Sequence, residues 1–143
     1  MKLIPEDRER LIRYVDFLES ELEDFPRFSR LDWKTYYEDR DLRRNIERWI
    51  ENLVNCSIDV AKVMLVIEDK RIPSTYREII RALGTTEPFD EEFGEAISQW
   101  SALRNILAHE YLDLRWDSIR KFVQSAEPHY ERLVRTIKRV LSS

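Results

Sequence analysis

The periodic pattern between Arg40 and Glu68 limits the possible folds of this chain more than any other feature. Apolar residues recur there every three or four positions, which is the spacing of one face of an α-helix. A helix of roughly 30 residues is about 45 Å long, which is typical of the spine of an up-and-down bundle and long enough to reach a second subunit. Asp39 or Asp41 is its expected N-cap. The apolar stripe comprises Leu42, Ile46, Trp49, Ile50, Leu53, Ser57, Val60, Ala61, Met64 and Ile67.

A shorter amphipathic segment precedes this helix. Pro5 is a favourable first helical residue, and Pro26 is expected to end the N-terminal helix. Residues 29–39 predict a short helical turn that carries several aromatic side chains. The core-facing stripe of the first helix is predicted to contain Leu11, Ile12, Val15, Leu18 and Leu22.

Capping signals divide the next part of the chain. Ser74 or Thr75 is expected to cap a short helix over 76–83, and Gly84 is a suitable C′ residue to end it. A longer helix is predicted over 90–111, because apolar residues recur there every three or four positions. Acidic residues in its first turns would complement the helix dipole. The apolar stripe comprises Phe93, Ile97, Trp100, Leu103 and Leu107.

The last segment follows after a polar stretch. Residues 112–116 are interpreted as a connector, and Asp117 or Ser118 as the cap of the final helix. Pro128 should kink or split that helix. The sequence therefore predicts an all-α fold, an up-and-down bundle of four to five main helices with short connections.

Composition agrees with this fold class. Of 143 residues, 43% are hydrophobic and 36% are charged, with two glycines and five prolines, which is typical of a helical protein. The length suits one domain over 1–143. The single Cys56 excludes an intrachain disulfide and fits a reducing cytoplasm. No signal peptide opens the chain and no apolar run approaches the roughly 20 residues that span a bilayer, so we expect a cytoplasmic protein without a membrane partner.

Charge is unevenly distributed along the chain. The net charge is −4, which argues against a generally basic nucleic-acid binder. Residues 84–114 contain seven acids and one base, whereas residues 115–143 contain seven bases and three acids. The basic segment admits two interpretations, a phosphate-binding patch or a solvated last helix with cations near its C-terminus. Charge alone favours the second.

Four polar side chains with catalytic potential lie between positions 104 and 111. On one continuous helix, Arg104 and Tyr111 share a face, and Asn105 and His109 share the neighbouring face. Arg104 and His109 are about 140° apart on such a helix. One phosphate could therefore meet both only if the helix unwound near Ala108 or a second chain contributed, which points to a dimer.

The pattern Arg104-Asn105-x-x-x-His109-x-Tyr111 resembles the signature of HEPN domains. Its His-x-Tyr extension is similar to that of the HepT-like toxins, which are encoded beside a minimal nucleotidyltransferase antitoxin. Residues 39–42, 73–78 and 116–122 resemble the same family, so the likeness covers most of the chain from about Asp32 onward.

This resemblance implies a homodimeric endoribonuclease that uses no metal and no cofactor, with a cleft at the dimer interface. Histidine titrates near pH 6.5, so His109 could take the 2′-hydroxyl proton of RNA or protonate the leaving 5′-oxygen. Arg104 could hold two phosphate oxygens with its planar fork. One histidine cannot easily do both, whereas a two-fold axis would bring two copies to one cleft. Asn105 would orient the imidazole or contact the RNA backbone.

The resemblance also implies a role for Tyr111 and a protein partner. In HepT-like toxins the MntA-like nucleotidyltransferase antitoxin transfers AMP to the tyrosine of His-x-Tyr. On Tyr111 this modification would add negative charge and bulk beside the RNA site, and so block the substrate.

Two other functions remain open from the sequence. The chain could be a non-catalytic helical partner that presents substrate to a nucleotidyltransferase, or a purely structural dimerisation module. The joint presence of Arg104 and His109 favours the enzyme. His129 is interpreted as a surface or cap residue, and one histidine beside one cysteine offers no metal cluster. The tryptophans are interpreted as core or interface residues, with Trp116 and Tyr36 the least firmly structural of the aromatics.

Overall fold

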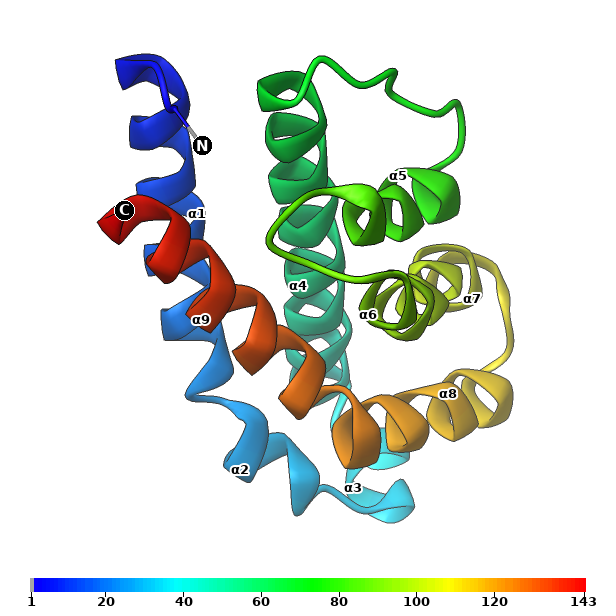
Figure 1. Ribbon diagram of the computed structural model, residues 1–143. Coiled ribbons are helices and arrows are strands. Elements are labelled where there is room, and N and C mark those ends of the chain that lie inside the picture. Colours follow the sequence, from blue (N-terminus) through cyan, green and yellow to red (C-terminus); the bar gives the residue numbers. More distant parts are fainter. Residues whose placement is uncertain (1) are drawn as a thin grey trace.

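The computed structural model describes residues 2–143, which form nine α-helices and two 3₁₀ segments with no strand among them. The predicted all-α fold is confirmed (Figure 1). Four of the helices, α1, α4, α8 and α9, have 14 or more residues. The elements are α1 (Pro5–Leu22), α2 (Phe25–Ser29), α3 (Trp33–Glu38), α4 (Arg40–Ile67), α5 (Tyr76–Ala82), η1 (Leu83–Thr85), α6 (Glu91–Ser98), η2 (Gln99–Ala102), α7 (Leu103–His109), α8 (Leu112–Ser125) and α9 (Glu127–Ser142).

Helix α4 is the spine of the bundle, as the periodicity predicts. Helix α1 packs along one side of it, and α5 and α7 pack against the other side, while α9 crosses α1 (Figure 1). The Asp39 side chain caps α4 by accepting a hydrogen bond from the Leu42 amide at 3.0 Å. Asp41 lies in the first turn, where a negative charge complements the helix dipole. Nine of the ten residues in the predicted stripe are apolar, and all nine contact the core. Leu42 and Ile67, at the two ends of the stripe, are partly buried, and the other seven are buried.

The N-terminal prediction is wrong in two details. Helix α1 ends at Leu22, and Pro26 lies in the first turn of the separate helix α2. This position suits proline, because the first amide groups of a helix have no intrahelical acceptor to lose. Ile12 is 44% exposed and therefore does not belong to the core face.

The segment over 90–111 is not one helix. Helix α6 ends at Ser98, the 3₁₀ segment η2 follows, and α7 begins at Leu103. Side chains in this region bond to nearby carbonyl groups: the Ser98 hydroxyl donates to Glu95 O at 2.9 Å, and the Ser101 hydroxyl to Ser98 O at 2.8 Å. Such local bonds compete with the regular helical pattern and favour a tighter turn.

Gly84 has a different role from the one predicted. It lies within η1 and does not have the positive φ of a left-handed C′ residue. A Cβ on Gly84 would lie 3.1 Å from the Cα of Gly94, and a Cβ on Gly94 would lie 2.4 Å from the carbonyl oxygen of Arg81. The two glycines therefore allow α6 to lie directly against the end of α5.

The C-terminal prediction is partly confirmed. Helix α8 ends at Ser125 and α9 begins at Glu127 with Pro128 in its first turn, so the last helix is split as expected. The predicted connector over 112–116 is wrong, because α8 begins at Leu112, and neither Asp117 nor Ser118 caps it. Trp116 is buried against Tyr36, with ring centroids 5.1 Å apart, and this packing draws the segment into the bundle.

Within residues 2–143, none of the helices combines the length and the apolar character that crossing a lipid bilayer requires.

Candidate functional site

Arg104 projects from the first turn of α7 toward the start of α5. Its guanidinium carbon lies 4.1 Å from the centroid of the Tyr76 ring, a cation–π arrangement. Arg104 is half-buried and Tyr76 is 50% exposed. The aromatic ring thus supports one face of the guanidinium while the site stays open to solvent.

His109 is the last residue of α7 and is exposed. Asn105 lies one turn earlier and is also exposed, so the two side chains share a face as predicted. In the part of the chain that the structure describes, no hydrogen bond joins Asn105 to His109. The histidine is therefore presented at a helix end, free to meet a second molecule.

The structure does not bring Arg104 and His109 together within one chain. Helix α7 is continuous from Leu103 to His109, so the alternative of unwinding near Ala108 is not adopted. Five helical residues correspond to about 140° of rotation and about 7.5 Å of rise. The two side chains thus leave α7 in different directions.

Tyr111 lies outside α7, so the prediction that it shares a helical face with Arg104 is wrong. Glu110 and Tyr111 have extended backbones, with ψ of 161° and 160°, and Tyr111 is the N-cap residue of α8. These extended backbones interrupt the helical path, and α8 starts in a new direction at Leu112 (Figure 1). Tyr111 is 83% exposed, which leaves its hydroxyl accessible to another protein.

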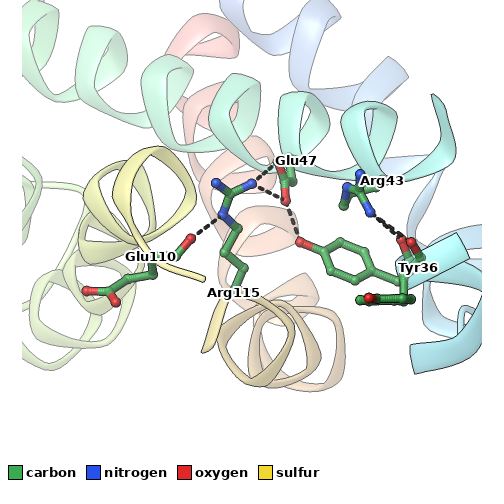
Figure 2. Close-up of polar contacts among 6 residues, drawn as sticks. Tyr36, Arg43, Glu47, Glu110 and Arg115 are labelled. Carbon is green, nitrogen blue, oxygen red and sulfur yellow. Dashed lines mark hydrogen bonds and ion pairs between the residues drawn. The ribbon is translucent and has the colours of Figure 1, made fainter. Parts of the chain in front are cut away.

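A second polar group, not predicted from the sequence, lies beside the segment 109–111. Arg115 Nη1 lies 3.3 Å from both carboxylate oxygens of Glu47, and Arg115 Nε donates to the Glu110 carbonyl oxygen at 2.7 Å (Figure 2). The Tyr36 hydroxyl donates to the same Glu47 carboxylate. Burial and this carboxylate raise the pKa of Tyr36, so its hydroxyl stays protonated.

The only sequence signal for this group is weak. Glu47 follows Ile46 on α4, so a charged residue falls beside the apolar stripe. Its partner Arg115 is 68 positions away and appears in the sequence as one of several cations. The two come together in the folded bundle, where α3 packs against both α4, which carries Glu47, and α8, which carries Arg115.

The other histidine has a structural role. His129 lies in the first turn of α9, where its Nδ1 accepts a hydrogen bond from Trp100 Nε1 at 3.0 Å. Accepting this bond requires a neutral imidazole with its proton on Nε2. Burial lowers the pKa of His129, which favours the neutral form. Among residues 2–143, no three His, Cys, Asp or Glu side chains gather as a metal site would require.

The Trp100–His129 bond predicts how stability depends on pH. Because the pKa of His129 is lower in the folded state, its contribution to the free energy of unfolding is fully present above the ordinary value of about 6.5. That contribution is lost as the pH falls from there through the lower pKa of the folded state. His129→Asn keeps an acceptor near the Nδ1 position but does not titrate. We expect urea denaturation at pH 7.5 and pH 5.5 to show a smaller difference in this variant, by about 1 kcal/mol, the net worth of one hydrogen bond. An unchanged difference would contradict the assignment.

Comparison with known proteins gives one family match. The family model described as Ribonuclease HepT-like matches residues 18–137 of the chain. The match begins in the last turns of α1, earlier than the sequence resemblance traced from Asp32, and includes the whole of α7 and α8. Among curated protein sequences, none matches this chain.

Two solved structures share the fold. A crystal structure of a mutant of the toxin–antitoxin MntA-HpeT is 18% identical, with a TM-score of 0.79 over 92% of this chain and 98% of its own. A toxin–antitoxin crystallised with AMP-PNP is also 18% identical, with a TM-score of 0.78 over 92% and 98% of the two chains. At this identity the likeness establishes the arrangement of the helices.

Proposed function

The chain belongs to the HepT-like ribonuclease family, and on this premise we propose that it is the toxin of a toxin–antitoxin pair, a metal-independent endoribonuclease that acts as a homodimer. The observation that carries the proposal is the placement of Arg104 and His109 on α7. Both side chains reach solvent, and they leave the helix in different directions. A dimer in which two copies of α7 face one cleft would supply an arginine and a histidine to the same phosphate.

The reaction assigns a role to each side chain. His109 of one copy removes the proton of the RNA 2′-hydroxyl, and that oxygen attacks the adjacent phosphorus. His109 of the second copy gives a proton to the 5′-oxygen as its bond to phosphorus breaks. Arg104 binds the phosphate oxygens and stabilises the charge of the transition state. The products are a 2′,3′-cyclic phosphate and a 5′-hydroxyl, and Asn105 is placed to contact the RNA backbone beside His109.

Regulation is assigned to Tyr111 and to a nucleotidyltransferase partner. Tyr111 is 83% exposed and lies two residues after His109, and both observations support this assignment. In the transfer, the Tyr111 oxygen attacks the α-phosphorus of ATP, the phenol proton is lost and pyrophosphate leaves. The added phosphodiester carries negative charge beside the RNA site, so it repels the substrate and fills the cleft.

The experiment that tests the activity is cleavage of an end-labelled RNA pool by purified, unmodified protein in a metal chelator. We expect cutting that survives chelation and leaves cyclic phosphate ends, together with growth arrest when the protein is expressed alone. Mass measurement before the assay verifies that Tyr111 carries no AMP. A folded, unmodified dimer that leaves every RNA intact would contradict the proposal.

A phenylalanine at position 111 tests the regulatory assignment. Tyr111→Phe removes the nucleophilic oxygen from an exposed position, so we expect a folded protein that still cuts RNA but accepts no AMP from the cognate transferase. Labelled ATP and mass measurement report the transfer. Tyr37→Phe, at another exposed tyrosine, is the control that should be modified like wild type. Equal labelling of the Tyr111→Phe protein would show that the modified residue lies elsewhere.

A further inference from the structure

The connector between α7 and α8 consists of two extended residues, Glu110 and Tyr111. The Glu110 amide donates to Ile106 O at 3.0 Å and so closes α7, while Tyr111 O accepts the Arg115 amide at 3.0 Å and so opens α8. The Glu110 carbonyl lies between these two helical patterns. Its hydrogen-bond partner therefore determines how firmly the connector is held.

That partner is the Arg115 side chain. Its Nε donates to Glu110 O at 2.7 Å, and its Nη1 lies 3.3 Å from each oxygen of Glu47 on α4. The ion pair is mostly withdrawn from solvent, with 24% of the Arg115 side chain and 13% of the Glu47 side chain exposed. The buried Tyr36 of α3 donates to Glu47 and fixes the carboxylate from its other side. One guanidinium thus joins the connector to the spine of the bundle (Figure 2).

We propose that Arg115 is a positioning residue, which together with Glu47 and Tyr36 holds the His109–Tyr111 connector in the geometry that both RNA cleavage and AMP transfer require. The catalytic part of this inference rests on the proposed function. Arg115 acts through the connector and not on phosphate, because the Glu47 carboxylate already balances its charge. The connector carries His109 at one end and Tyr111 at the other, so one contact places both side chains.

The contact depends on the shape of the guanidinium. Its Nε and Nη1 donors are held rigidly in one plane, so they can bond to the connector and to Glu47 at the same time. A lysine in this place has one nitrogen on a flexible chain. It can keep the ion pair with Glu47 or the bond to Glu110 O, but it does not reproduce the fixed angle between them.

The first test compares the same substitution at two arginines. Arg115→Lys breaks the proposed contact, whereas Arg132→Lys acts on an ion pair of α9 with Asp90 (2.8 Å, 38% of the Arg132 side chain exposed). For RNA cleavage we expect Arg115→Lys to lower kcat about 10- to 100-fold, because small displacements of a reacting group are costly, with KM changed by less than about 3-fold. Arg132→Lys should leave both constants near wild type. An Arg115→Lys protein with wild-type kcat, measured where wild type cuts RNA, would overturn the inference.

The second test does not depend on cleavage. Backbone amide exchange over residues 106–115 reports whether the connector opens, and we expect it to be faster in Arg115→Lys than in wild type or Arg132→Lys. Labelling of Tyr111 by the transferase should slow in the same variant. Glu47→Gln keeps an acceptor for Arg115 but removes the charge. Its amide exchange rate over residues 106–115 should therefore lie between those of wild type and Arg115→Lys. This variant replaces Arg115→Lys in the test if Arg115→Lys folds poorly. If Arg115→Lys and Glu47→Gln both exchange at the wild-type rate, the inference is overturned, even if the chain cuts no RNA. If these two variants exchange faster but the wild-type protein cuts no RNA, only the proposed function is contradicted.

Discussion

Replacing His109 with alanine is expected to reduce RNA cleavage by at least about 100-fold, and toward the background rate if both proton transfers are lost. The side chain is exposed at the end of α7, so its removal leaves no cavity in the core. We therefore expect the thermal unfolding midpoint to stay close to that of wild type. The measurement is the single-turnover rate on a defined RNA in a metal chelator, since this isolates chemistry from product release.

The second histidine supplies the matched control. His129→Asn also removes an imidazole, but from the structural bond to Trp100. We expect this variant to cut RNA at about the wild-type rate near pH 7.5, while its stability depends less on pH than that of wild type. If His109→Ala folds and cuts like wild type, the catalytic assignment is wrong, whatever the family membership of the chain.

The long helix and its cap are the parts of the fold that local sequence determines most fully. The apolar stripe of α4 predicts its length to within one residue, because each position contributes to the same buried face. Asp39 and Thr75 act as caps through their own neighbouring amides, at Leu42 and Glu78. These interactions span only a few residues, so they are visible in the sequence.

The break within 90–111 depends instead on distant packing. Trp100 is held by His129 of α9 and by the edge of Phe122, whose ring centroid is 5.3 Å away. These contacts join residues that are more than 20 positions apart, and the apolar spacing continues through the 3₁₀ segment. The sequence therefore predicts one helix where the structure has two with a tighter turn between them.

The candidate site is likewise only partly predictable from the sequence. Arg104, Asn105, His109 and Tyr111 are recognisable by type and spacing, and their roles stay predictions. The support around them is not recognisable, because Tyr76 beneath Arg104 and Glu47 beside Arg115 come from other helices. Composition alone also gives no reason to separate Arg115 from the other cations of the C-terminal segment.

Dimers with a single altered chain provide the most demanding test of the shared cleft. If both copies of His109 serve one reacting phosphate, a dimer of one wild-type chain and one His109→Ala chain has lost either the acid or the base. We expect its cleavage rate to fall about 100-fold, as for loss of one general acid or base. Two independent sites, each complete within its own chain, would instead leave about half of the rate.

The mixed dimers can be isolated with a different affinity tag on each chain and two successive purification steps. A doubly tagged wild-type dimer sets the reference rate, and a mixed dimer with one His129→Asn chain controls for the tags and for reduced stability. Mass measurement after the assay checks that the chains have not exchanged. A rate near half of the reference would place all reacting groups within one chain, and the separation of Arg104 and His109 along α7 would then require the helix end to rearrange when RNA binds.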